Sequence, residues 1–212
     1  MKYRGQAGLD EYIHKNFIKT PMEDGTFLEL GAMNGIRFSN TKFFEDNMGF
    51  NRGVLIEPDP RSFISLKKNR PNCECFNYAV HSSLSEVSFL QSNEPAVSTI
   101  TDIATEDFKQ KWHRKSKTIK VPAERLDSIL SKSTLEYIDF WSLDTEGSEL
   151  ECLLSMNWEI PVGLICIEMN RDENEINKIL TSNGLILAGE HKQGRHKDVI
   201  NKIYINKNYF RF

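Results

Sequence analysis

The sequence predicts an α/β fold with one mainly parallel, seven-stranded sheet, helices on both faces and an antiparallel last strand. Short apolar runs alternate with stretches of helical periodicity, which is typical of parallel sheets built from strand-helix-strand units. A length of 212 residues with 39% hydrophobic residues is enough for a single hydrophobic core. We therefore expect residues 1–212 to form one domain.

The apolar runs and helical patterns give the expected elements in order. The strands cover residues 26–30, 53–57, 74–80, 138–143, 164–168, 185–188 and 202–205. The helices cover residues 10–19, 40–47, 60–68, 149–154 and 173–182. The polar segment between the last two strands is too short for a helical crossover, so these strands should form an antiparallel hairpin.

Two stretches lie outside this alternation. Residues 1–25 form an N-terminal helical segment before the first strand. Residues 82–127 break the rhythm, although 87–90 predict an extra strand and 106–111 an extra helix. We expect residues 82–127 to be an insertion at the carboxyl edge of the sheet, where ligands bind in open parallel sheets.

Charge and cysteine usage narrow the class of protein. A formal net charge of −3 gives no broad positive field, so nucleic acid is not an expected partner. The four cysteines lack a zinc-type Cys-x-x-Cys spacing and should be reduced thiols. No apolar stretch approaches the roughly 18 residues of a membrane span, and the N-terminus has no secretory pattern. We expect a soluble, cytoplasmic protein without stable membrane insertion.

A glycine loop follows the first strand and reads Gly31-Ala32-Met33-Asn34-Gly35. Glycines allow a sharp turn and a close approach to a ligand. The loop lacks the middle glycine of the dinucleotide fingerprint and the Gly-Lys-Ser/Thr of a phosphate-binding loop, which disfavours a pyrophosphate. Glu29, at the end of the strand, suits a cationic amino group better than a phosphate. Taken alone, a solvated carboxylate beside a turn glycine explains this pattern equally well.

A second acidic residue, Glu57, ends the second strand about 20 positions beyond the glycine loop. Carboxylates at this spacing bind ribose hydroxyls in nucleoside-binding units. Pro58 and Asp59 follow directly, and Ala79 reaches the same edge from the third strand, where small groups could frame an adenine ring. The sequence therefore predicts a nucleoside site, although Glu57 could also be only a polar strand terminus.

A third group of acidic residues follows the fourth strand, at Asp144, Glu146 and Glu149. Neighbouring carboxylates can accept a proton, bind a cation or cap a helix. Capping explains Glu149, at the start of the next helix, but it does not explain Asp144. Glu168 ends the fifth strand, close to Asn170.

These segments resemble the FkbM-type family of S-adenosylmethionine-dependent methyltransferases. The matching segments are residues 5–10, 27–35 with 39–41, 53–60 and 138–150, of which the last, a strand ending in Asp-x-Glu-Gly-x-Glu, is the most specific. The resemblance implies a Rossmann-like class I methyltransferase fold with S-adenosylmethionine as cofactor. It also implies methyl transfer to a hydroxyl oxygen of a sugar, a glycan or a small natural product.

The candidate site residues follow from these segments. Those expected at the cofactor are Glu29, Gly31, Ala32, Gly35, Asn40, Glu57, Pro58, Asp59, Ala79 and Asp144. Those expected at the reacting end are Asp144, Glu146 and Glu168, one of which would accept the hydroxyl proton. Further candidate bases are His81, His113, His191 and His196.

Three alternatives remain open from the sequence. We do not expect a metal ion to be needed, but Asp144, Glu168 and Asn170 could together bind Mg²⁺, as in some small-molecule O-methyltransferases. A nicotinamide-dependent sugar oxidoreductase or epimerase shares the strand-glycine-carboxylate pattern, although the chain lacks Gly-x-Gly-x-x-Gly and an obvious Tyr-x-x-x-Lys pair. The third alternative is a non-catalytic Rossmann-like binding module. The oligomeric state does not follow from the sequence.

Overall fold

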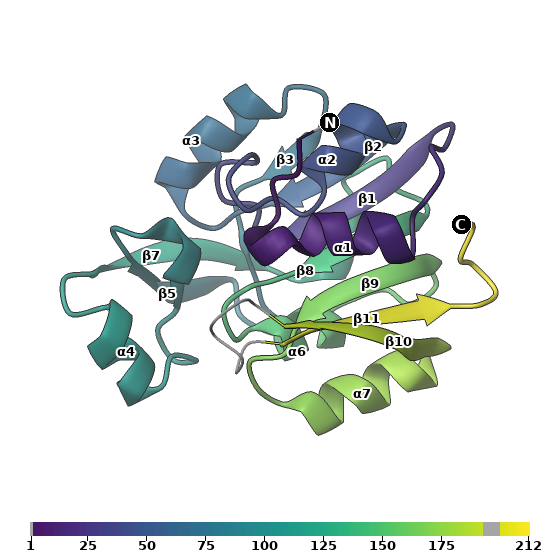
Figure 1. The fold of residues 1–212 in the computed structure, drawn as a ribbon. Coiled ribbons are helices and arrows are strands. Elements are labelled where there is room, and N and C mark those ends of the chain that lie inside the picture. The colour runs from purple at the N-terminus through teal and green to yellow at the C-terminus, as the bar shows by residue number, and fades with distance from the viewer. Residues whose placement is uncertain (1, 193–199) are drawn as a thin grey trace.

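A seven-stranded sheet forms the centre of the computed structural model, which describes residues 2–192 and 200–212 (Figure 1). Its strand order is β10-β11-β9-β8-β1-β2-β3. The bounds are β1 Gly25–Leu30, β2 Phe50–Ile56, β3 Glu74–Phe76, β8 Ile138–Leu143, β9 Val162–Glu168, β10 Leu185–Lys192 and β11 Ile200–Asn206. Strands β3, β2, β1, β8 and β9 pair in parallel, whereas β11 is antiparallel to both β9 and β10. The predicted sheet and its closing hairpin are confirmed.

Helices cover both faces of this sheet because successive strand residues point to opposite sides. In β9, Leu164 and Cys166 belong to one core cluster, and Ile165 and Ile167 belong to the other. The first cluster is covered by α1 Leu9–Asn16, α2 Lys42–Asn47 and α3 Pro60–Asn69. The second is covered by α5 Leu126–Leu130, α6 Glu149–Leu154 and α7 Glu173–Ser182. Each face of the sheet thus has its own apolar layer.

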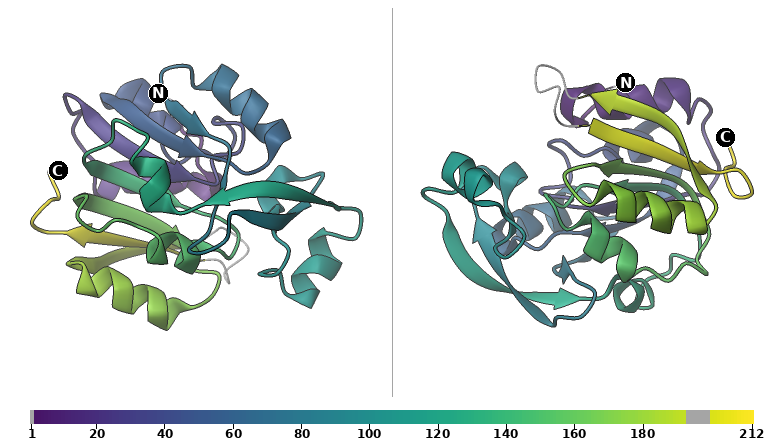
Figure 2. Two further views of the ribbon diagram at one scale, coloured as in Figure 1. Left: turned by 180° about the vertical axis from the view of Figure 1, so that it is seen from behind. Right: turned by 90° about the horizontal axis from the view of Figure 1, so that it is seen from below.

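A second sheet of four strands lies beside the first, as the views in Figure 2 show. Its order is β4-β7-β5-β6, with bounds β4 Ala79–Val80, β7 Lys117–Glu124, β5 Glu86–Gln91 and β6 Thr99–Ile100. The helix α4 Glu106–Trp112 connects β6 to β7. The extra strand and helix expected at 87–90 and 106–111 correspond to β5 and α4. The two-residue strand β6 and the longer β7 were not predicted.

The single strand expected at 74–80 is wrong, because the chain changes sheets within it. Residues 74–76 pair with β2, whereas residues 79–80 pair with β7. Between them, the Asn77 Nδ2 donates hydrogen bonds of 2.7 Å to the Glu57 carbonyl and 3.1 Å to the Pro58 carbonyl. This side chain fastens the crossing point to the end of β2, so β3 ends there.

Among the residues that the structure describes, no helix combines the length and the apolar character that a membrane span requires.

Candidate active site

A cavity that is open to solvent lies at the carboxyl ends of β1, β2 and β8. Small-molecule sites are commonly found at this edge of a parallel sheet. The main sheet contributes Gly31, Met33, Glu57, Asp144 and Glu146 to its lining. The second sheet and its connections contribute Ala79, Phe89, Pro95, Ser98 and Ile100. The cavity therefore lies where the two sheets meet.

Gly31 allows the two loops at the floor of the cavity to touch. Its φ of +76° lies in the left-handed region, and a Cβ built there would lie 1.8 Å from the Asp144 carbonyl oxygen. Only glycine fits such a close approach of two backbones. Ala32, the next residue, is buried in the core on the side of α1, α2 and α3. The first loop residue thus faces the cavity, whereas the second faces the interior.

Gly35 makes room for a side chain rather than for a ligand. Its φ is +75°, and an added Cβ would lie 2.6 Å from both the Arg70 Cγ and the Leu66 Cδ1. Gly35 is also absent from the described residues that line the cavity. Glycine is therefore needed at position 31 because two backbones approach closely, and at position 35 because the Arg70 and Leu66 side chains fill the space.

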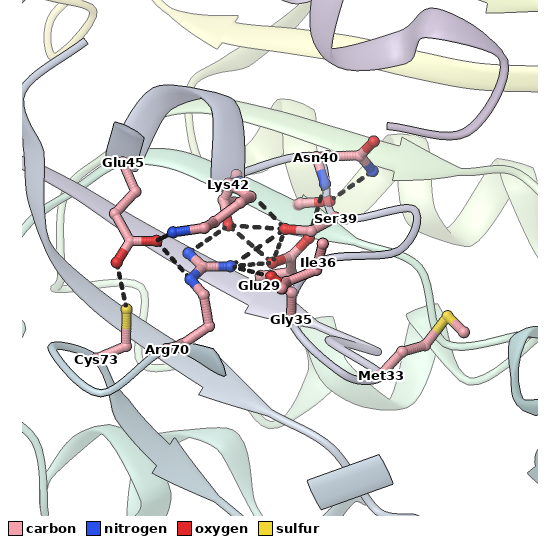
Figure 3. A network of polar contacts seen from close by, with 12 residues as sticks. Glu29, Met33, Gly35, Ile36, Ser39, Asn40, Lys42, Glu45, Arg70 and Cys73 are labelled. Carbon is pink, nitrogen blue, oxygen red and sulfur yellow. Dashed lines mark hydrogen bonds and ion pairs between the residues drawn. The ribbon is translucent and has the colours of Figure 1, made fainter. Parts of the chain in front are cut away.

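Glu29 lies in a buried polar network beneath the loop (Figure 3). Its Oε1 accepts a hydrogen bond of 2.9 Å from the Asn40 backbone N–H. Its Oε2 accepts bonds of 2.8 Å from Ser39 Oγ and 2.7 Å from Thr41 Oγ1, and it lies 3.6 Å from Arg70 Nη1. Glu29 is not among the described lining residues of the cavity. Its contacts are with the chain segment that precedes α2.

Asn40 links this segment to the neighbouring strand. Its Nδ2 donates a hydrogen bond of 3.1 Å to Ser142 Oγ on β8, and its side chain is buried. The helix expected at 40–47 begins only at Lys42. The residues before it are held instead to the Glu29 carboxylate, which accepts a hydrogen bond from the Asn40 backbone N–H.

Glu57 is buried against the cavity and is bound by backbone amides. Its Oε2 accepts a hydrogen bond of 2.7 Å from the Met33 N–H, and its Oε1 accepts one of 2.8 Å from the Asp59 N–H. Burial raises the pKa of this carboxyl to about 7, despite the lowering effect of the two amides. Each carboxylate oxygen can accept more than one bond, so hydroxyl donors in the cavity can still bind.

The residues after Glu57 separate into two roles. Pro58 lines the cavity. Asp59 instead caps α3, since its Oδ1 accepts bonds of 2.9 Å from the Arg61 N–H and 2.8 Å from the Gln91 Nε2. Burial raises the pKa of Asp59, but the donors from Arg61 and Gln91 outweigh it and hold the pKa below its usual range. Asp59 therefore ties α3 to the second sheet.

Asp144 and Glu146 line the cavity, and Glu168 lies beside them although it is not among the described lining residues. These three are called the cavity carboxylates below. Oxygen atoms from all three lie within 4.8 Å of one another. Burial raises the pKa of Asp144 well above its usual value, and the charges of Glu168 and Glu146 raise it further. Burial and the Glu168 charge do the same for Glu146. Carboxyls in such a group hold protons at a pH where isolated carboxyls are ionised.

The adjoining loop is fixed by hydrogen bonds to the second sheet and to α6. Glu146 has a φ of +55°, which is strained for a residue with a side chain. Its carbonyl accepts a bond of 2.7 Å from Thr99 Oγ1 of the second sheet. Glu149 Oε1 accepts bonds of 2.9 Å from the Thr145 N–H and 3.1 Å from the Gly147 N–H. Glu149 therefore holds the loop that precedes α6, and the N-cap residue Ser148 makes no side-chain capping bond, so capping does not explain Glu149.

The remaining candidates lie as follows. Asn170 Nδ2 donates a hydrogen bond of 2.6 Å to Glu168 Oε2. His81, His113 and His191 are not among the described lining residues, and His196 lies outside the residues that the structure describes.

The sequence placed residues 82–127 at the ligand-binding edge but did not single out Phe89 and Ile100, which line the cavity. These two read in the sequence only as ordinary apolar residues. Sequence reasoning missed Arg70, which is fully buried beneath the glycine loop. The basic end of α3 gave no signal for it, since cations at a helix C-terminus are common on surfaces.

Comparison with known proteins adds evidence of relationship. The family model described as "Methyltransferase FkbM domain" matches residues 29–209. A comparison with curated protein sequences gave no match.

The fold is similar to those of several solved structures. TrmK from M. capricolum, in complex with S-adenosyl-homocysteine, has a TM-score of 0.55 and 11% identity, covering 94% of this chain and 69% of that one. Fibrillarin from Aeropyrum pernix, with natively bound S-adenosyl-L-methionine, has a TM-score of 0.53 and 13% identity, with coverages of 91% and 72%. Methyltransferase FkbM from Methylobacillus flagellatus KT has a TM-score of 0.55 and 15% identity, with coverages of 92% and 50%. At these identities the likeness concerns the fold.

Proposed function

The chain belongs to the FkbM methyltransferase domain family and is therefore a methyltransferase, and from this premise we propose that it methylates a hydroxyl oxygen of a sugar, a glycan or a small natural product. Membership of a methyltransferase family argues against a nicotinamide-dependent oxidoreductase or epimerase. We also propose that residues 1–212 act as one domain, with the segment 82–127 forming a wall of the active site.

S-adenosylmethionine is the cofactor, and the residues around the cavity fit it. Gly31 leaves the backbone bare at the floor of the cavity. Glu57 offers a buried carboxylate to the ribose hydroxyls, and Tyr78 and Ala79 line the part of the cavity where the adenine would lie. When bound, the cofactor supplies an activated methyl group on a sulfonium. Glu29 and Gly35 support the loop from behind and do not touch the cofactor.

The observation that carries oxygen as the acceptor atom is the group of cavity carboxylates. An attacking hydroxyl must lose its proton as the new oxygen–carbon bond forms, and a positioned carboxylate can accept that proton. Asp144 lines the cavity, and its raised pKa makes its ionised form a stronger base than an ordinary aspartate. In this proposal Asp144 receives the proton, while Glu146 and Glu168 set its proton affinity.

A methyl-transfer assay against sugars, lipids and small hydroxylated metabolites tests this function, with Asp144→Ala beside the natural chain. Transfer to a hydroxyl that is lost in Asp144→Ala supports the proposal, and transfer only to nitrogen or carbon acceptors contradicts it. A thermal-shift measurement tests the cofactor, since a ligand that binds only the folded state raises the melting temperature. S-adenosylhomocysteine should raise it and NAD should not. No shift with either would favour a non-catalytic binding module.

A metal-assisted form of the same reaction has one observation in its favour. The cavity carboxylates place oxygen atoms from three side chains within 4.8 Å of one another, and oxygen ligands are those that Mg²⁺ prefers. Asp144, Glu146 and Glu168 would hold the ion, with Asn170 beside Glu168. Activity that EDTA abolishes and Mg²⁺ restores would establish this form, whereas activity unchanged in EDTA would exclude it.

A further inference from the structure

Arg70 follows the last residue of α3 and is fully buried, at 0% exposure. Its backbone N–H still bonds to the Leu66 carbonyl at 2.9 Å, so the helix fixes where its side chain begins. The side chain then runs under the glycine loop, and its guanidinium lies 5.3 Å from the centre of the Phe27 ring. Burying a guanidinium is costly unless carboxylates and acceptors surround it.

The guanidinium holds the loop at three points (Figure 3). Nη1 donates hydrogen bonds of 3.0 Å to the Gly35 carbonyl and 3.2 Å to Ser39 Oγ. Nη2 donates a bond of 3.2 Å to Thr41 Oγ1. The planar fork of an arginine can reach separate acceptors in fixed directions, which a lysine ammonium does not reproduce. The segment 35–41 is thereby fastened at its beginning, middle and end.

Two carboxylates pair with Arg70, and Lys42, whose Nζ lies 3.1 Å from Glu45 Oε2, is the second cation beside them. Glu45 Oε2 lies 2.5 Å from Nε, and Glu29 Oε2 lies 3.6 Å from Nη1. We call Arg70, Glu29 and Glu45 the arginine-centred group. Glu29 also accepts the hydrogen bonds from residues 39–41. The same loop segment is therefore held from two sides by one ionic group.

The loop that Arg70 holds, residues 31–41, faces the cavity on the side opposite Arg70. Met33 and Phe38 line the cavity, whereas Arg70 is not among the described lining residues. Both residues have a positive φ, +48° for Met33 and +62° for Phe38. Such conformations persist only where the surroundings hold them. The arginine-centred group lies directly behind this strained stretch and supplies that hold.

We propose that Arg70 is a positioning residue for the cofactor: it sets the shape of the segment 31–41 through Gly35, Ser39, Thr41 and Glu29, without touching the ligand. The proposal rests on the proposed function, because it takes S-adenosylmethionine as the occupant of the cavity. Its consequence is specific. Loss of the arginine fork weakens cofactor affinity but leaves the turnover rate of the cofactor-bound enzyme nearly unchanged.

Two variants test the proposal while keeping the protein folded. Arg70→Lys keeps the charge and removes the fork. Arg70→Met combined with Glu45→Gln removes the fork but keeps the formal net charge of the group, since one cation and one anion are lost together. In both variants S-adenosylhomocysteine affinity, measured calorimetrically on folded protein, should fall by about 10-fold or more, as for other residues that orient a binding shell. Turnover at saturating cofactor should stay within about twofold of the natural chain.

Arg211→Lys is the matched control. Arg211 also ion-pairs a buried carboxylate, with Nη2 2.6 Å from Asp139 Oδ2. Asp139 lies at the start of β8, the end of the sheet opposite the cavity. This control should change stability but not S-adenosylhomocysteine affinity. If both Arg70 variants bind as tightly as the natural chain, the proposal is rejected. If the natural chain itself does not bind, the proposed function fails instead.

Discussion

Two groups of acidic side chains in this protein differ in how their negative charge is compensated. In the arginine-centred group, Glu29 and Glu45 surround a buried guanidinium. In the cavity carboxylates, Asp144, Glu146 and Glu168 lie against one another, and among the described residues no ion pair joins Asp144 or Glu146 to a cation. The first group balances its charge, whereas the second concentrates it.

The difference indicates that the arginine-centred group supports the folded structure, whereas the cavity carboxylates are suited to proton transfer. A buried ion pair repays its desolvation only through close geometry and added hydrogen bonds, which the arginine-centred group has. Carboxylates crowded together destabilise the folded protein, because each raises the pKa of the next. A cluster that costs stability and lies on a cavity is where proton transfer is expected. The predictions below test this contrast from the largest expected effect to the smallest.

The largest effect is expected for Asp144→Asn, which keeps the shape of the side chain and removes the base. Turnover should fall by about 10²-fold to 10⁴-fold, the usual contribution of general-base catalysis. The melting temperature should not fall, because one member of a like-charged cluster is neutralised. Methyl-transfer kinetics and a thermal melt measure the two quantities. Asp127→Asn, which removes a charge paired with Arg125 away from the cavity, is the control. Turnover within threefold of the natural chain would show that Asp144 is not the base.

Arg70→Met should give the largest loss of stability. It leaves the buried Glu29 without its cation, whereas Glu45 keeps Lys42, 3.1 Å from its Oε2. Breaking a buried pair in this way costs about 3–5 kcal/mol. Urea unfolding measures the change. Lys109→Met removes an ion pair whose Glu106 partner is largely exposed and should change little. Equal losses in the two variants would contradict the contrast drawn between compensated and crowded carboxylates.

Glu57 belongs to neither group, because among the described residues its carboxylate accepts hydrogen bonds only from two backbone amides. The effect of replacing it should depend on pH. Its pKa is raised from 4.5 to about 7 in the folded chain, so the folded state holds the proton more tightly than the unfolded state. Stability is therefore lost as pH rises from 4.5 through about 7. In Glu57→Gln, the decrease of about 3 kcal/mol in the free energy of unfolding across this pH range should be absent. Unfolding free energies at several pH values measure the slope, and an unchanged slope in the variant would refute the assignment.

The smallest effect is expected for Glu146→Gln. The folded pKa of Glu146 is raised well above 4.5, so its ionisation destabilises the protein increasingly as pH rises above that value. Neutralising it should stabilise the chain above neutral pH, by on the order of 1 kcal/mol. Glu94→Gln should act in the opposite direction, because the hydrogen bond from Arg37 lowers the pKa of Glu94. Chemical denaturation at pH 8 compares the two, and a destabilised Glu146→Gln would contradict the prediction.

The sequence predicted β1, β8 and β9 well because these strands are buried on both faces. Residues 138–143 are apolar except for Asp139 and Ser142, and their predicted bounds match β8. The prediction for 74–80 was wrong because the apolar pattern continues while the chain changes sheets, and the Asn77 side chain marks the change only through its tertiary contacts. Strand β7 was missed because only Val121 and Ala123 are buried in it and Pro122, a residue uncommon inside strands, lies between them.

In the site, too, residues at strand ends were predicted, whereas contacts that depend on the path of a loop were not. Glu57 and Asp144 were found because strand ends converge on one edge of a parallel sheet, and both line the cavity. Glu29 also ends a strand, but donors from residues 39–41 enclose it. That enclosure depends on the path of a loop, which short-range patterns do not encode. Arg70 was missed for the same reason.

The position of β11 has a consequence for the order in which the chain can fold. This last strand lies between β9 and β10, which precede it in the sequence. During synthesis from the N-terminus, the edge of β9 stays unpaired until residues 200–206 have been made, and exposed strand edges favour association with other chains. Deleting β11 would therefore separate β10 from the rest of the sheet rather than shorten the sheet at its edge. An interior strand of this sheet is thus made after both of its neighbours.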